Sequence, residues 1–350
     1  MSCKFTGWLA VAPYVFWVAT FGDRRAARTL AIGVPVAAMA FWAVNPPLWH
    51  QPLAGLEKFF ELNLSRADHA WLNIPTTYFG ARYDARTPLP WHNSLVWTAI
   101  TVPVGTLALF GVGLGRALRN WRARPEWMLL VGHWAVLVVV RATPFAPPHD
   151  AERLFLPSFA FLAMLAGLGG EALLGWTQRG GSMAGWLGRG ALAVALAGSM
   201  TSTMWYAPQW LSYYNLLVGG LRGANALGME PTYYWDGLDA EVLAWLDEHT
   251  ADDEKIAFAS SSPENWELMR QWGSLRVACF PAEPGRYRWY VIQRRPSTLS
   301  DAERRLTARG RPALRKTIRR PGAGWGPWRL DVPIVEVYDY AEYERALVLR

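Results

Sequence analysis

Residues 154–175 read LFLPSFAFLAMLAGLGGEALLG, an apolar stretch of 22 residues with a single charged side chain. An α-helix of this length spans ~33 Å, close to the thickness of the hydrocarbon core of a bilayer. Five more apolar stretches occur at 5–22, 28–45, 94–115, 127–143 and 188–206. The sequence therefore predicts a polytopic α-helical membrane protein, with about six transmembrane helices over residues 1–206.

The net charge of +7 lies wholly in this apolar part of the chain. Residues 1–206 contain 16 Lys and Arg against 9 Asp and Glu, whereas residues 207–350 contain 19 of each. The arginines concentrate in three linkers, 23–29, 115–126 and 177–189. Basic loops are retained on the cytoplasmic side of a membrane, so we expect the outer loops 46–93 and 141–153 to face outward. The same bias favours membrane lipid, and not nucleic acid, as a partner.

The second half of the chain, residues 207–350, predicts a soluble α/β domain on the extracytoplasmic side. Strand-like segments occur at 255–259, 275–280, 289–293 and 334–338, and helix-like segments at 238–249, 263–272 and 300–309. Strands that alternate with helices favour a small α/β sandwich. The serines at 260–262 precede Pro263 without a G-x-S-x-G pattern, so they indicate the start of a helix and not a nucleophile.

Side chains able to bind a phosphate gather in the outer loop 141–153. His149, Asp150 and Arg153 lie within five residues of one another. The planar guanidinium of Arg153 suits a phosphate, and His149 and Asp150 could position an oxygen of the ligand. The alternative is that Asp150 caps a helix and Arg153 extends its charge towards lipid head groups.

The other outer loop, 46–93, contains His50 and His92. Apolar residues at helical spacing between Leu53 and Leu64 predict a helix that lies in the membrane interface. Such a helix either forms a wall of the site or seals the edge of the bundle. We expect one substrate-binding cavity at the outer membrane boundary, formed by His50, His92, His149, Asp150 and Arg153. No residue is assigned as catalytic, and no metal or cofactor is expected.

Glycine motifs occur inside two of the apolar stretches, at 111–115 and 167–170. No strand precedes either motif, so they predict close packing of helices and not a nucleotide site. The two cysteines, Cys3 and Cys279, have neither a redox nor a zinc spacing, and buried thiols are favoured over a disulfide.

Several blocks of the sequence resemble bacterial members of the GT-C superfamily of membrane glycosyltransferases. The similarity lies in the branch of the protein O-mannosyltransferases and lipid A aminoarabinose transferases. The blocks are 4–8 (KFTGW), 45–53 (NPPLWHQPL), 88–92 (PLPWH), 149–157 (HDAERLFLP) and 211–223 (LSYYNLLVGGLRG). The resemblance implies transfer of a sugar from a polyprenyl-phosphate donor to a protein, lipid or glycan acceptor on the outer side of the cytoplasmic membrane.

The chain departs from this family in its first residues. The resemblance implies a catalytic carboxylate in the first outer loop, whereas this sequence resembles the family only from about its seventh helix. We therefore expect a fragment that retains the donor-phosphate half of the site and transfers no sugar alone. Two other classes of function stay open. A transporter or flippase would place charged residues at mid-membrane, where only His133 is found, and a non-catalytic scaffold would not depend on His149 or Arg153.

Overall fold

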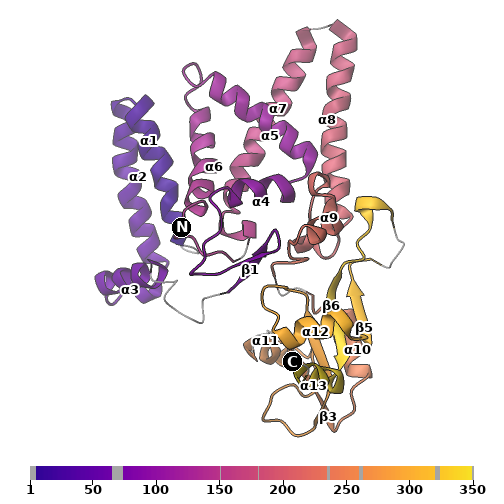
Figure 1. Cartoon of the computed structure of the whole chain (residues 1–350). Helices are drawn as coiled ribbons and strands as arrows, with labels where there is room; N and C mark the ends of the chain where they lie inside the picture. Colours follow the sequence, from indigo (N-terminus) through magenta and orange to yellow (C-terminus); the bar gives the residue numbers. More distant parts are fainter. Residues whose placement is uncertain are drawn as a thin grey trace. The chain divides into compact units, whose positions relative to one another are not determined.

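The computed structural model describes residues 5–64, 74–149, 151–179, 181–234, 237–259, 263–319 and 324–348 (Figure 1). The chain divides into two compact units. Unit 1 comprises residues 1–73 and 84–201, and unit 2 comprises residues 74–83 and 202–350. A boundary near residue 206 was expected from the sequence, but the short segment 74–83 groups with unit 2 although it comes from the first half of the chain.

Unit 1 is helical. Its elements are the 3-10 helix η1 (Phe5–Ala10), α1 (Val11–Phe21), α2 (Arg24–Ala43), η2 (Pro46–Leu48), α3 (Pro52–Leu64), α4 (Asn93–Thr101), α5 (Val104–Arg119), α6 (Trp127–Arg141), η5 (Ala151–Leu154), α7 (Ser158–Arg179) and most of α8 (Gly181–Met204). Helix α7 packs against both α5 and α6, and α1 packs against α6 and α2. Leu109, Phe110 and Leu165 are among the buried side chains at the contact of α5 with α7.

The prediction of six transmembrane helices is wrong. Within the described residues, two helical segments, Arg24–Ala43 and Ser158–Gly175, are long and apolar enough to cross a membrane. Helix α6 has 15 residues and spans only ~22 Å, and α1 has 11 residues. Helix α8 is long, but Arg189, together with the glycines, serines and threonines of the helix, lowers its hydropathy.

The predicted span at 94–115 is interrupted at Pro103. Helix α4 ends at Thr101, and Val102 is extended, with φ −90° and ψ 134°. The residue before a proline is driven out of the helical region, and proline itself has no N–H to donate to the preceding turn. The stretch therefore folds as two helices of nine and 16 residues.

The glycine motifs serve the packing of α5 against α7, as the sequence predicted. A Cβ atom on Gly113 would lie 1.7 Å from the carbonyl oxygen of Leu165, and one on Gly169 would lie 1.9 Å from that of Leu109. No side chain fits at either position, so the two backbones touch directly. Gly111 and Gly115 have nothing within 4 Å of such an atom, so only one glycine of the 111–115 motif is at the contact.

Unit 2 is built on a four-stranded mixed sheet with the order β3-β4-β6-β5 (Figure 1). Strand β3 is parallel to β4, and the other two pairings are antiparallel. The strands are β3 (Glu254–Phe258), β4 (Arg286–Gln293), β5 (Leu314–Thr317) and β6 (Pro333–Asp339). Its helices are α9 (Gly220–Ala226), α10 (Ala240–Glu248), α11 (Pro263–Gln271), α12 (Asp301–Arg309) and α13 (Tyr340–Val348), with short 3-10 turns η6 (Trp210–Ser212), η7 (Leu216–Val218) and η8 (Gly326–Trp328).

Two apolar clusters account for the layers of unit 2. Val291 and Val337 pack with side chains of α10 and α11, whereas Tyr290, Ile292 and Tyr338 pack with α12 and α13. Consecutive residues of a strand point to opposite faces, so helices cover both faces of the sheet. The strands predicted at 255–259, 289–293 and 334–338 coincide with β3, β4 and β6, but the predicted strand at 275–280 forms only an isolated bridge to β3.

A β-hairpin from the first half of the chain, β1 (Thr76–Tyr78) with β2 (Ala81–Tyr83), completes unit 2. The backbone N–H of Thr77 donates to Oε1 of Glu230 at 3.1 Å, and Tyr233 Oη donates to the carbonyl oxygen of Thr77 at 2.7 Å. The amide of Gly80 donates to the carbonyl oxygen of Gly228 at 2.9 Å. These bonds join segments about 150 residues apart, and the sequence alone gave no indication of them.

Candidate functional site

The loop that carries His149 is held by a buried arginine. Arg141 is the last residue of α6 and is 3% exposed. Its guanidinium donates to the carbonyl oxygens of Pro147, of Pro148 at 2.9 Å and of His149 at 3.3 Å. A buried guanidinium needs acceptors for its N–H groups, and three loop carbonyls provide them. The loop is thereby fixed in shape, and His149 is 2% exposed.

The segment that carries His92 is tied to the same place. Asn93 begins α4, and its side-chain Nδ2 donates to the carbonyl oxygens of Pro90 at 2.8 Å and Arg141 at 3.2 Å. One residue further, Ser94 Oγ donates to the carbonyl oxygen of Val138 at 2.8 Å. His92 itself is the half-buried residue that precedes the helix. The structure thus brings the segments of His92 and His149 together at the C-terminal end of α6.

The remaining predicted site residues have different surroundings. Arg153 is exposed on the 3-10 turn η5, which packs against α4 and precedes α7. His50 is exposed just after η2, whose contacts are with α2 and α3. Asp150 lies outside the described residues. His92, His149 and Arg153 therefore lie on elements that pack together, whereas His50 follows a turn packed on a different pair of helices.

The sequence did not single out Arg141, Asn93 or Ser94, although all three are buried and polar. One signal was present, because an arginine that follows an unbroken apolar run must find partners where the run ends. The proline-rich segment after Arg141 supplies its carbonyl partners, since each proline keeps its carbonyl oxygen but has no N–H.

A second buried polar group lies in unit 2. Glu230 and Arg295 form an ion pair, with Nε 3.1 Å from Oε2, and both side chains are almost fully buried. The other carboxylate oxygen of Glu230 accepts from the amides of Thr77 and Ser297, at 3.1 and 3.2 Å. A buried pair with this many hydrogen bonds mainly fixes which segments meet. We therefore assign it to docking of the β1–β2 hairpin and not to chemistry.

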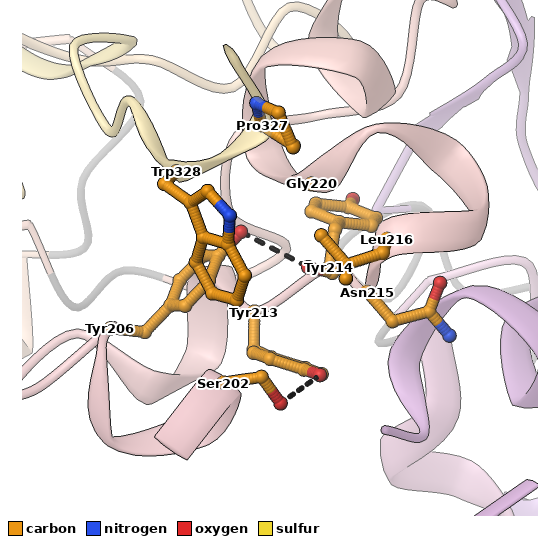
Figure 2. A pocket seen from close by; sticks show the side chains of 9 residues that line it. All are labelled: Ser202, Tyr206, Tyr213, Tyr214, Asn215, Leu216, Gly220, Pro327 and Trp328. Carbon is orange, nitrogen blue, oxygen red and sulfur yellow. Dashed lines mark hydrogen bonds between the residues drawn. The ribbon is translucent and has the colours of Figure 1, made fainter. Parts of the chain in front are cut away.

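A small pocket lies within unit 2 (Figure 2). It is lined by residues of the segment 211–223 together with residues of two other segments: Ser202, Tyr206, Tyr213, Tyr214, Asn215, Leu216, Gly220, Pro327 and Trp328.

The polar atoms of this pocket are engaged with one another. Tyr206 Oη accepts from the amide of Leu221 at 2.9 Å and donates to the carbonyl oxygen of Tyr214 at 3.0 Å, while Ser202 and Tyr213 share a hydrogen bond of 3.0 Å. Burial raises the pKa of Tyr206 to about 12, so the hydroxyl stays protonated and keeps both bonds. The pocket therefore orders the 211–223 block.

Comparisons with known protein families, with curated proteins and with solved structures found no match. Within the described residues, no group of three or more His, Cys, Asp or Glu side chains could hold a metal ion. The chemistry of the site is therefore inferred from its own residues.

Proposed function

We propose that the chain serves a membrane glycosyltransferase reaction by binding the polyprenyl-phosphate sugar donor, whose sugar passes to an acceptor hydroxyl outside the cytoplasm. The observation that carries the proposal is that the polar segments of His92, Arg141 and His149 adjoin the start of α7, a helix apolar enough to cross a membrane. The polyprenyl chain of a lipid-linked sugar stays in the hydrocarbon of the membrane. The phosphate of the donor therefore lies at the membrane surface, where a helix that crosses the membrane begins.

The donor has a phosphate and an apolar polyprenyl chain, and the segment before α7 has side chains suited to each. Arg153 is exposed on η5, five residues before α7 begins at Ser158, and a guanidinium binds phosphate through two parallel hydrogen bonds. Phe145, in the loop after α6, is 91% exposed, and Leu156, three residues after Arg153, is also exposed, so this segment offers apolar side chains to a polyprenyl chain. His149 lies too deep to contact a bulky donor directly, and its backbone carbonyl oxygen accepts from Arg141.

Binding of a polyprenyl monophosphate to the purified full chain tests the proposal. A charge-assisted hydrogen bond contributes about 1.5 to 3 kcal/mol, so Arg153→Ala should weaken binding roughly ten- to a hundredfold. Arg276→Ala is the matched control, because Arg276 is exposed on unit 2. Equal dissociation constants for the wild type and Arg153→Ala would contradict the proposal.

A further inference from the structure

Arginines from two separate segments of the chain lie at one end of unit 1. Arg24, Arg25 and Arg28 occupy the first turns of α2, and Arg119 and Arg122 lie at the end of α5 and in the turn that follows. All five side chains are exposed, and in the described part of the chain none of them forms an ion pair. We refer to these five residues as the arginine rim.

The two parts of the rim form one surface because their segments are in contact. The indole Nε1 of Trp17 donates to the carbonyl oxygen of Pro125 at 2.6 Å. The rings of Phe21 and Trp121 meet edge to face, with their centroids 5.8 Å apart. Figure 1 shows the α1–α2 turn and the α5–α6 connection at the same end of unit 1.

The carboxylates of these segments already have partners. Asp23 accepts from the amide of Ala26 at 2.8 Å as the cap of α2. Glu126 is 3.5 Å from Arg124, and Glu171 is 3.1 Å from Arg116. Because these carboxylates bond to groups outside the rim, the five guanidinium groups of the rim are available for an external anion.

Aromatic and apolar side chains lie directly beside the rim. The guanidinium of Arg122 stacks over the ring of Trp121, 4.7 Å from its centroid, and Trp121 is exposed. Beyond Arg28, the surface of α2 exposes Ile32, Val36 and Met39. Membrane proteins place cationic side chains at the surface of a bilayer, tryptophan at the boundary and aliphatic side chains in the interior. The groups beside the rim follow the same order.

From this arrangement we infer that the arginine rim binds the phosphate groups of anionic phospholipids at a membrane surface. Guanidinium groups bind phosphate oxygens in pairs, and an anionic leaflet concentrates such groups next to the hydrocarbon that α2 would enter. The inference rests on the proposed membrane association, but the rim lies at the Trp127 end of α6, whereas the proposed donor site lies at the Arg141 end.

Native mass spectrometry of the full chain, released from detergent, tests the inference. The chain is offered dioleoylphosphatidylglycerol or dioleoylphosphatidylcholine, and the lipids retained per chain are counted. The wild type should retain phosphatidylglycerol in preference to phosphatidylcholine, and 0.5 M NaCl should weaken this preference. The test variant replaces the five rim arginines by glutamine and should lose the preference.

A control variant removes the same charge from exposed arginines of unit 2, which do not belong to the rim: R276Q, R304Q, R309Q, R311Q and R345Q. It should keep the preference for phosphatidylglycerol. If the fivefold rim variant does not fold, R24Q/R25Q/R28Q and R119Q/R122Q are measured separately, and each should reduce the preference.

Three outcomes would overturn the inference: no lipid preference in the wild type, an unchanged preference in the rim variants, or an equal loss in the control. Binding of a DNA oligonucleotide that depends on the rim, without any preference for phosphatidylglycerol, would also overturn it. Binding of polyprenyl phosphate is measured on the same samples. A chain with the lipid preference but without that binding would contradict the proposed function alone.

Discussion

Glu283 holds the loop before β4 in place by accepting three donors. Its Oε2 accepts from the amides of Cys279 and Phe280, both at 2.7 Å, and its Oε1 pairs with Arg270. Burial acts to raise the pKa of Glu283, but the hydrogen bonds from Arg270 and the two amides outweigh it and lower the pKa. Burial, with the nearby charge of Glu283, raises the pKa of the Cys279 thiol to about 11, so this cysteine is protonated at neutral pH.

A lowered pKa makes the contribution of Glu283 to stability depend on pH. The folded state releases this proton more readily than the unfolded state. The stabilisation is therefore complete above the unfolded pKa, ~4.3, and is lost as the pH falls through the folded value. We expect Glu283→Gln to lower the free energy of unfolding by about 1 to 2 kcal/mol at pH 7, and by less at pH 3.5. Thermal unfolding at the two pH values measures this.

The control for this measurement is Glu248→Gln, at an exposed position at the end of α10. It should change the unfolding midpoint little at either pH. A difference between the wild type and Glu283→Gln that stays constant from pH 7 to pH 3.5 would show that the charge of Glu283 is not what stabilises the loop.

Single residues were only partly predictable. His149 and Arg153 could be proposed from their position at the end of an apolar run, but their environments differ in the structure, one buried and the other exposed. The role of Arg141 depends on three carbonyl groups, six to eight residues further along, that a folded loop turns towards it. Backbone acceptors have no side-chain signature, so the sequence could not reveal them.

Among the elements, the pair α5 and α7 is the most sensitive to a single methyl group. A Cβ at position 113 would overlap the carbonyl oxygen of Leu165, so Gly113→Ala must push the helices apart. We expect a loss of about 1 to 3 kcal/mol, the usual range for overpacking. Gly111→Ala meets nothing within 4 Å and should be neutral or stabilising by up to about 1 kcal/mol. Thermal unfolding of both variants in detergent compares them, and equal midpoints would exclude the close contact.

The sequence allowed the apolar stretches to be recognised, but it did not show where helices begin and end within them. Pro103 was visible, yet a proline can kink a long helix without ending it, and the extended conformation of Val102 decides between the two. In unit 2 the strands β3, β4 and β6 were found because they are rich in β-branched and aromatic residues. Strand β5, with the sequence LRKT, has no such signal and was missed.

For the molecule as a whole, the distribution of arginines makes a prediction about orientation. The arginine rim should face the cytoplasm, and the loop 141–153, which lies between the candidate spans α2 and α7, should lie outside. Alkaline phosphatase is active only outside the cytoplasm, so its fusion after Thr143 should be active and its fusion after Arg28 inactive. The reverse pattern would place the proposed donor site on the wrong side of the membrane.

The division into two units makes a second prediction at this scale. The amides of Thr77 and Gly80 are bonded to unit 2, although both residues precede most of unit 1 in the sequence. Hydrogen exchange follows the stability of the unit that holds an amide. Gly113→Ala should therefore speed exchange in α5 and α7 but leave Thr77 and Gly80 unchanged. Faster exchange at Thr77 in this variant would assign the hairpin to unit 1.

The docking of the β1–β2 hairpin also orders events while the chain is being synthesised. Thr77 is made 153 residues before Glu230, and Pro75 is made 222 residues before Ser297. At a translation rate of ~5 to 20 residues per second, Glu230 and Ser297 are synthesised roughly 10 to 45 s after Thr77 and Pro75. An isolated two-stranded hairpin is marginally stable in water, so this segment must wait, unfolded, while most of unit 1 is made. Unit 2 can therefore be completed only if the β1–β2 segment, which is translated early, has not formed other contacts by the time Glu230 and Ser297 are translated.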